Sequence, residues 1–153
     1  MKVIRRVEMM RVLALDVGER RVGVAVSDPT RTVARPVGTL ERGFRAADFA
    51  AIADLVAEHD AGLVVVGRPL TLRGEVGPQA RQVERYAQAL AESLPVPVQL
   101  WDERYSTATA EEVLRRMRKK GKRRGQGEVD AVAAAVILQG FLDSHAWEEG
   151  EDG

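Results

Sequence analysis

The sequence predicts an α/β fold: a mixed five-stranded sheet, three antiparallel strands and then two parallel ones, with helices on both faces in the order βββαβαβαα. Two observations lead to this class. The first 40 residues contain three strand patterns separated only by tight turns, which is typical of an antiparallel meander. From residue 43 onward, segments with helical spacing alternate with short apolar runs, as in parallel strands joined by helical crossovers.

Three strands are expected near the N-terminus. Residues 11–16 (RVLALD) form an apolar run that ends in a carboxylate, and residues 17–20 form a turn. Residues 21–27 (RVGVAVS) alternate as a strand does, and residues 28–30 form a second turn. Residues 32–40 contain a proline and therefore predict an edge strand.

The middle of the chain predicts two units of helix and strand. Residues 43–60 have apolar side chains at helical spacing, and residues 63–66 (LVVV) form the continuous apolar run of a strand covered on both faces. A loop at residues 67–77 leads to a second helix at residues 80–94, which two prolines end. Residues 98–101 form the fifth strand.

Two more helices are expected after the fifth strand. The first runs from about residue 107 to residue 118, and a basic loop with glycines at residues 119–127 separates it from a final helix that begins near Glu128. The final helix is rich in alanine, so it can lie close to the sheet. Its expected buried stripe consists of Val129, Val132, Ala133, Val136, Ile137 and Phe141.

The composition indicates one ordinary domain. The chain has 153 residues, 45% of them hydrophobic, which is enough for one core and too short for two domains of equal size. We expect a single domain at residues 10–143, an N-terminal extension at residues 1–9 and an acidic tail at residues 144–153. We expect no membrane span and no secretory signal. The absence of cysteine excludes disulfides and thiolate metal sites and fits a cytoplasmic protein.

Acidic residues follow the expected strands at one edge of the sheet. Asp16 ends the first strand, and Asp102 and Glu103 follow the fifth. The fourth strand ends at the same edge with a glycine and an arginine, residues 67–68. Sites in such sheets gather outside the carboxyl ends of the parallel strands. Asp130, in the first turn of the final helix, can reach the same edge. Three or four carboxylates can therefore converge there.

Converging carboxylates indicate a metal site. They raise one another's pKa unless a cation neutralises them, and hard divalent cations prefer oxygen ligands. Two such ions can activate a water and stabilise the leaving oxygen in phosphodiester hydrolysis. We expect Mg²⁺ or Mn²⁺, as one ion or two. Each acid alone also has an ordinary explanation, because strand-end aspartates often form turns or cap helices.

Asp102 and Glu103 cannot both face such a site readily, because neighbouring strand residues point to opposite faces. We expect Glu103, which has the longer reach, to face the metal. Asp102 would then pair with Arg104 or cap the next helix.

Basic residues cluster at residues 115–124 (RRMRKKGKRR), although the formal net charge of the chain is zero. Eight cations exceed what the dipole of a helix end needs. We expect this segment to bind the phosphates beside the scissile bond without reading sequence. The expected nucleic-acid-binding residues are Arg68, Arg104, Lys119, Lys120, Lys122, Arg123 and Arg124.

Four strings of the sequence resemble the YqgF family, also called RuvX. They are LALDVGERRVGVAVSD (13–28), VVVGRP (64–69), DERYSTATA (102–110) and VDAVAAAVILQGFL (129–142). The resemblance covers residues 10–143 and implies a ribonuclease H-like fold, which agrees with the element order above. It also implies a metal-dependent nuclease, a hydrolase that cleaves ester bonds as an endonuclease or exonuclease. Carried over by motif, the catalytic and metal-binding acids are Asp16, Glu103 and Asp130.

The resemblance further implies substrates. Family proteins are linked to processing of the 5′ end of precursor 16S rRNA in ribosome biogenesis and, by analogy with RuvC, to Holliday junctions in DNA recombination and repair. The sequence does not rank RNA against DNA, and it leaves open ribosomal precursor particles and a homodimer as partners. The chain departs from the family pattern at residues 67–75, where Arg68 replaces an apolar residue.

Two other functions fit parts of the sequence. Asp-x-Gly followed by a hairpin also resembles the first phosphate motif of actin-like ATPases and sugar kinases. Those nucleotide-binding phosphotransferases need two such domains, for which this chain is too short. A non-catalytic RNA- or protein-binding role in ribosome assembly is the other alternative, and the presence of all the acids argues against it.

Overall fold

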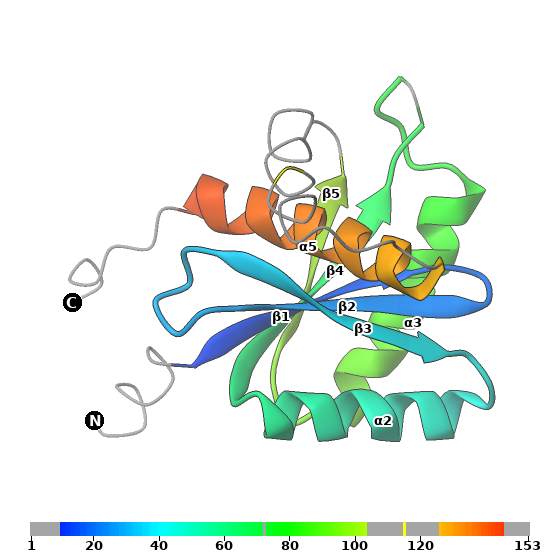
Figure 1. The fold of residues 1–153 in the computed structure, drawn as a ribbon. Helices are drawn as coiled ribbons and strands as arrows, with labels where there is room; N and C mark the ends of the chain where they lie inside the picture. Colours follow the sequence, from blue (N-terminus) through cyan, green and yellow to red (C-terminus); the bar gives the residue numbers. More distant parts are fainter. Residues whose placement is uncertain (1–9, 72, 104–114, 116–125, 146–153) are drawn as a thin grey trace.

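The computed structural model describes residues 10–71, 73–103, 115 and 126–145 of the chain. Figure 1 shows a central twisted sheet with helix α5 lying across one face and helices α2 and α3 on the other. The elements, in chain order, are β1 (Arg11–Val17), β2 (Arg21–Ser27), β3 (Ala34–Glu41), α2 (Arg45–Glu58), β4 (Ala61–Pro69), α3 (Pro78–Ser93), β5 (Val98–Glu103) and α5 (Gln126–His145).

The sheet has five strands in the order β3-β2-β1-β4-β5. Strand β1 pairs antiparallel with β2, and β2 pairs antiparallel with β3. On its other side β1 pairs parallel with β4, and β4 pairs parallel with β5. The predicted mixed sheet, with three antiparallel strands followed by two parallel ones, is confirmed.

Most strands and helices lie where the sequence predicts them, but two strands are longer. Strand β4 extends to Pro69 and β5 extends to Glu103, because Arg68 pairs with Asp102 and Pro69 pairs with Glu103 in the backbone register. The apolar pattern ends earlier than the backbone pairing does. The helix expected at residues 107–118 lies outside the described residues, apart from Arg115.

Two hydrophobic cores flank the sheet. The larger core, against α2 and α3, includes Leu13, Leu15 and Val66, while the core beneath α5 includes Val12 and Ala14. The alternation of β1 side chains between the two cores follows from the period of a strand. No described helix combines the length and apolar composition needed to cross a membrane.

Helix α5 lies unusually close to the sheet. A Cβ atom on Gly23 of β2 would lie only 2.0 Å from the backbone oxygen of Asp130, so only glycine fits there. Ala131, Ala134 and Ala135 are at most 2% exposed, and their small side chains permit the same close contact. The packing therefore places the start of α5 directly over β2.

The helix is also fixed at its other end. The buried side chain of Gln139 accepts a hydrogen bond from the backbone N–H of Ala34 and donates one to the backbone oxygen of Thr32. These bonds satisfy a buried amide and tie α5 to the start of β3.

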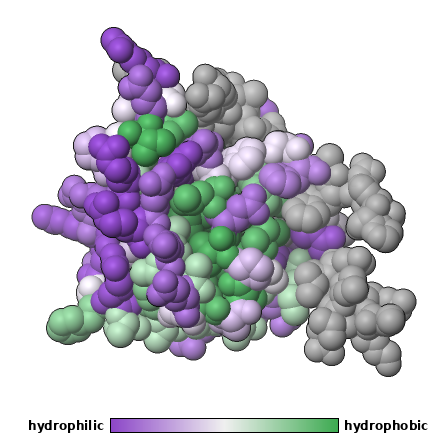
Figure 2. Space-filling view, turned by 180° about the vertical axis from the view of Figure 1, so that it is seen from behind, coloured by the Kyte–Doolittle hydropathy of each residue, from purple (hydrophilic) through white to green (hydrophobic). Residues whose placement is uncertain are grey.

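The surface opposite the view of Figure 1 has a hydrophobic area near its centre, bordered on one side by hydrophilic residues (Figure 2). A shallow groove runs between α3 and β5. Its lining consists of Glu84, Ala87, Gln88, Ala91, Val98 and Leu100.

Candidate active site

Asp16 lies near the carboxyl end of the central strand β1. It pairs with Gly23 of β2 and shares a sheet face with Val12 and Ala14, so its side chain points toward α5. The pKa of Asp16 is raised, first by burial and then by the negative charge of Asp130. A half-buried carboxylate with a raised pKa at this edge is the first element of the site.

Glu103 is the last residue of β5 and points to the same face as Trp101, which packs under α5. Burial, and then the negative charge of Asp16, raise the pKa of Glu103 to about 7. Gly67 leaves room for this carboxylate, because a Cβ atom there would lie 2.7 Å from Glu103 Oε2 and 2.6 Å from Ile137 Cδ1. Gly67 is a residue that the sequence pattern alone did not assign to the site.

Asp130 is held by Arg21. The Arg21 Nε–H donates to Asp130 Oδ2 at 2.9 Å, and both side chains are partly exposed. Arg21 lies two residues before Gly23 in β2, so it reaches the α5 face beside Asp16. A shallow groove of about 220 Å³ lies here; its lining is Asp16, Gly18, Glu19, Arg20, Arg21 and Asp130.

The structure places Asp16, on β1, near enough to Asp130 of α5 and to Glu103 of β5 for their charges to interact. The charge of Asp130 acts on Asp16, and the charge of Asp16 acts on Glu103. Among the described residues, neither Asp16 nor Glu103 has an ion-pair partner. Two adjacent acids without a neutralising cation favour the approach of a positively charged ligand.

The donor atoms are suited to a hard divalent cation, since all are carboxylate oxygens. As the side chains stand, no group of three His, Cys, Asp or Glu residues within the described part of the chain is close enough to hold a metal ion. The ion pair of Asp130 with Arg21 accounts for part of this, because it turns one carboxylate toward a guanidinium. The chemistry of the donors fits Mg²⁺ or Mn²⁺, whereas Arg21 competes with such an ion for the third acid.

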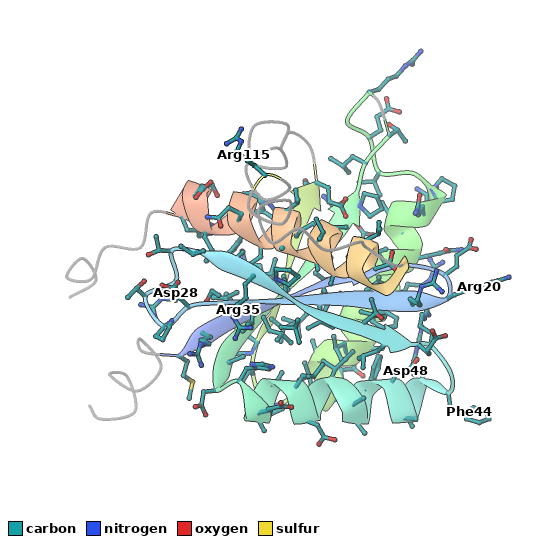
Figure 3. The ribbon with its side chains drawn as sticks, in the orientation of Figure 1. Arg20, Asp28, Arg35, Phe44, Asp48 and Arg115 are labelled. Carbon is teal, nitrogen blue, oxygen red and sulfur yellow. The ribbon has the colours of Figure 1, made fainter. Side chains whose placement is uncertain are left out.

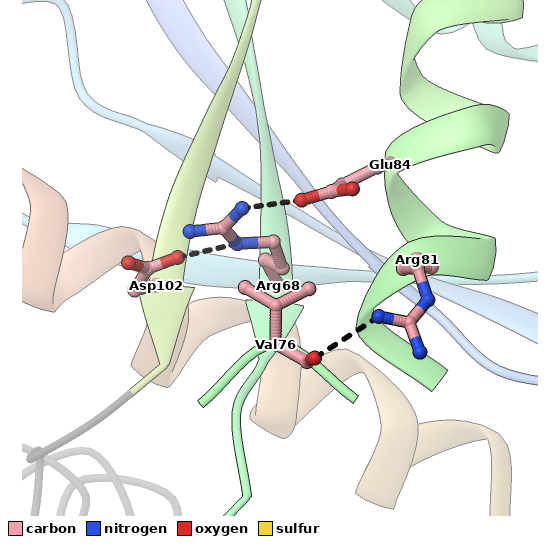
Figure 4. Close-up of polar contacts among 5 residues, drawn as sticks. All are labelled: Arg68, Val76, Arg81, Glu84 and Asp102. Carbon is pink, nitrogen blue, oxygen red and sulfur yellow. Dashed lines mark hydrogen bonds and ion pairs between the residues drawn. The ribbon is translucent and has the colours of Figure 1, made fainter. Parts of the chain in front are cut away.

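Asp102 and Arg68 lie on the opposite face, against α3. Arg68 Nε donates to Asp102 Oδ1 at 2.7 Å, and Arg68 also forms an ion pair with Glu84 of α3 (Figure 4). These hydrogen bonds raise the pKa of Arg68. The sequence predicted that Arg68 binds nucleic acid and that Asp102 pairs with Arg104 or caps a helix. Among the described residues, Asp102 and Glu84 both pair with Arg68. Arg104 lies outside these residues, and the role of Arg68 in nucleic-acid binding stays a prediction.

The other residues predicted to bind nucleic acid lie outside the part of the chain that the structure describes. These six residues are Arg104, Lys119, Lys120, Lys122, Arg123 and Arg124. Arg21 is the reverse case, a residue at the site that sequence reasoning missed. The antiparallel register of residues 11–17 with residues 21–27 could have identified it, because that register sets Arg21 on the face of Asp16.

Residues 10–144 match the model of a family described as "RuvX: Holliday junction resolvase". The chain belongs to the RuvX family. The resemblance seen in the sequence is therefore confirmed, and with it the enzyme class: RuvX proteins are nucleases, hydrolases of phosphodiester bonds.

Curated relatives within the RuvX family carry a second name. A Chloroflexus aurantiacus protein named "Putative pre-16S rRNA nuclease" is 45% identical over 87% of this chain and 86% of its own length. An Anaeromyxobacter dehalogenans protein of the same name is 46% identical over 90% of this chain and 99% of its own length.

Solved structures show the same fold at low sequence identity. RuvC of T. thermophilus in complex with a Holliday junction substrate has a TM-score of 0.58 at 18% identity, covering 90% of this chain and 96% of that one. The fowlpox virus Holliday junction resolvase has a TM-score of 0.53 at 11% identity, covering 88% of this chain and 99% of that one. These matches confirm the ribonuclease H-like fold of this RuvX chain.

Proposed function

We propose that this RuvX protein is a metal-dependent nuclease that processes the 5′ end of precursor 16S rRNA. The observation that carries the proposal is the meeting of Asp16 and Glu103 at the carboxyl edge of the sheet. Both have raised pKa values, and neither has an ion-pair partner among the described residues. Strand ends that present unneutralised carboxylates in a nuclease fold suit cation-assisted phosphodiester hydrolysis.

In this proposal Asp16, Glu103 and Asp130 hold one or two Mg²⁺ or Mn²⁺ ions. When bound, such ions supply an activated water and stabilise the leaving oxygen. Asp16 and Glu103 contribute ionised oxygens from two strands, and their fixed backbones keep these oxygens at one edge. Arg21 keeps Asp130 beside them while its own positive charge opposes the binding of a cation.

The choice of substrate is supported by the names of the curated relatives, which are pre-16S rRNA nucleases at 37–46% identity. The basic segment at residues 115–124 supplies charges suited to an RNA backbone. With this substrate, the protein would act in the cytoplasm and would bind ribosomal precursor particles.

Holliday junction resolution is the second candidate. The family description and the fold shared with RuvC favour it. Resolution of a symmetric junction requires two cuts, so this function would involve a homodimer and would place the protein in DNA recombination and repair.

The test is cleavage by purified protein with Mg²⁺ or Mn²⁺. The substrates are precursor 16S rRNA carrying its 5′ extension, a four-way DNA junction, and linear single and double strands. We expect metal-dependent cleavage of the precursor near the mature 5′ end. Preferential cutting of the junction would favour the second candidate, and tight binding without cleavage of any substrate would favour a non-catalytic assembly factor.

Metal binding is tested separately from cleavage. In metal-free buffer, added Mn²⁺ should raise the melting temperature (Tm) of the wild-type protein, because a bound ion stabilises the folded state. Asp16→Asn should lose most of this shift, whereas Asp28→Asn should keep it. The Asp28 carboxylate lies in the turn after β2, where it accepts hydrogen bonds from Thr30, Thr32 and Val33. An equal shift in both variants would remove Asp16 from the metal site.

The basic segment has its own test. Neutralising Lys119, Lys120, Lys122, Arg123 and Arg124 should weaken binding to all nucleic acids alike and flatten the dependence of affinity on salt. The Tm shift with Mn²⁺ should persist. An unchanged salt slope would make the segment a solvated connector.

A further inference from the structure

A second groove lies on the other side of the β1–β2 turn from the carboxylates. It has a volume of about 270 Å³ and runs over the ends of α2 and α3. Gly18 and Glu19 line both this groove and the acidic one, so only the turn separates the two. A polymer that crosses the acidic edge can continue directly into this groove.

Three arginines make the groove basic. Arg42, Arg45 and Arg85 line it, with Glu19 as its one acidic lining residue. Arg42 donates a hydrogen bond to the backbone oxygen of Gly18 at 2.6 Å. Among the described residues, none of the three arginines forms an ion pair. Unlike Arg68, they are available to an anionic ligand, and a guanidinium suits phosphate oxygens.

Aromatic rings hold two of these arginines in place. The guanidinium carbons of Arg42 and Arg45 lie 5.0 and 5.7 Å from the centre of the Tyr86 ring, and that of Arg45 lies 5.9 Å from the Phe49 ring. Cation–π contacts restrict long side chains. The positive charges are therefore positioned before any ligand arrives.

The Tyr86 hydroxyl is buried and unpaired within the described part of the chain. Tyr86 lines the groove and is only 2% exposed, yet its hydroxyl has no hydrogen-bond partner among the described residues. Buried hydroxyls almost always have a partner. The fold thus leaves one hydrogen bond unmade in a residue that lines the groove.

Phe44 directly precedes Arg45, one of the groove arginines, in the sequence. It is the residue before α2 and is 86% exposed. Figure 3 shows its ring directed away from the body, at the same end of the molecule as Arg20 and far from Asp28 and Arg35. A large exposed aromatic ring next to a basic groove is the arrangement that proteins use to stack unpaired bases.

We propose that this groove binds a single-stranded polynucleotide segment next to the scissile phosphate. Arg42, Arg45 and Arg85 contact its phosphates, and Phe44 stacks on an unpaired base. The bases of a duplex are already stacked on one another, so the ring selects single strands. The inference rests on the proposed nuclease function, and it adds a substrate class: a strand that is unpaired beside the cut.

The experiment measures binding without catalysis. Asp16→Asn protein in metal-free buffer is titrated into short fluorescent single strands of RNA and DNA with the same sequence, and into the blunt duplex, with fluorescence anisotropy as the readout. Phe44→Ala should weaken single-strand binding about tenfold, and Phe44→Trp should restore it. Arg45→Gln with Arg85→Gln should weaken it about tenfold and reduce its salt slope.

Matched controls lie elsewhere on the surface. Val33→Ala removes a different exposed apolar side chain, and Arg35→Gln removes an exposed charge at the far end of the sheet. Both should leave single-strand binding unchanged. The proposal would be overturned if Phe44→Ala bound single strands as tightly as the Asp16→Asn parent protein does. It would also be overturned if Phe44→Ala lost as much affinity for the duplex as for single strands. The affinities for RNA and DNA single strands should fall alike in these variants, since both polymers have phosphates and bases. A loss of affinity for one polymer alone would show that the groove binds that polymer and not the other.

This binding result is independent of the nuclease test. If cleavage proved insensitive to Asp16→Asn, the proposed function would fail while single-strand binding could still depend on Phe44. If cleavage required Asp16 but Phe44→Ala bound single strands normally, only the groove proposal would fail.

Discussion

Asp102 and Glu103 are neighbours in β5, yet their surroundings are opposite. Asp102 faces α3 and is paired with Arg68, which Glu84 also holds. Glu103 faces α5, where burial and the charge of Asp16 raise its pKa to about 7. On one face of the strand end the acid is ion-paired within the fold, and on the other face the described residues supply no ion-pair partner.

This difference distinguishes carboxylates that stabilise the fold through ion pairs from carboxylates that are candidates for binding a ligand. An ion-paired carboxylate contributes to the folded state, whereas a buried carboxylate beside another one costs stability until a cation arrives. A residue that costs stability in isolation is a candidate for function. Substitutions on the two faces should therefore differ in kind as well as in size.

The largest effect is expected on cleavage. Glu103→Gln and Asp16→Asn keep side-chain size but remove a charged oxygen from the proposed metal site, so the cleavage rate should fall by orders of magnitude. Asp102→Asn should retain most of the activity, because Asp102 and its partner Arg68 lie on the α3 face, away from the acids on the α5 face. Rates are measured on the same precursor RNA. Loss of activity in Asp102→Asn with retention in Glu103→Gln would reverse the assignment of the two faces.

The next effect concerns the close contact that places Asp130. Gly23→Ala would set a Cβ atom 2.0 Å from the Asp130 backbone oxygen, so α5 must shift. We expect a loss of about 3 kcal/mol in the free energy of unfolding, together with reduced cleavage. Gly38→Ala in β3 is the control, since a Cβ atom there meets nothing within 4 Å. Denaturant unfolding measures both; similar stabilities would show that α5 yields easily.

A smaller effect follows from the pKa of Glu103. Because its pKa in the folded protein is about 7 against an ordinary value of 4.5, the folded state binds more protons than the unfolded state between these values. Stability contributed at this position is therefore lost as pH rises through about 7 and is restored in acid. Without metal, Glu103→Gln should melt about 3–8 °C above wild type at pH 8, and the gain should vanish near pH 4. A gain that does not depend on pH would contradict this.

The smallest effect is expected on the ion-paired face, where Arg68 contacts Asp102 and Glu84. Arg68→Met leaves Asp102 and Glu84 without their shared cation and should lower the Tm by about 2–4 °C, with cleavage unchanged. Arg81→Met is a matched control, because within the described part of the chain the Arg81 side chain makes one hydrogen bond, of 3.3 Å, to the Val76 backbone oxygen (Figure 4). If Arg68→Met instead weakened nucleic-acid binding at constant stability, Arg68 would act on the substrate as the sequence predicted.

The sequence was sufficient to predict which strand ends carry the acids of the candidate site. Period-two alternation and the rule for the carboxyl ends of parallel strands set Asp16 and Glu103 at one edge. The same alternation separated Glu103 from Asp102. These inferences succeed because they depend on strands whose order follows from short connections.

The partners of charged residues could not be predicted in the same way. Arg68 meets Asp102 only through the register of β4 with β5, and it meets Glu84 only through the placement of α3. Arg21 and Asp130 are 109 residues apart. The basic groove takes Arg42 from the residue after β3, Arg45 from the start of α2 and Arg85 from the middle of α3. No pattern within one segment of sequence reveals it.

The close seating of α5 has a consequence for the life of the chain. Helix α5 is the last described element to be synthesised, yet it covers Val12 and Ala14 near the beginning and supplies Asp130. Its contacts with β2 and β3 span more than a hundred residues, so they form only after Asp130 and Gln139 have been synthesised. A nascent chain carries Asp16 and Glu103 without their third acid. A nuclease whose proposed substrate is ribosomal RNA is thus left incomplete until the ribosome has synthesised α5.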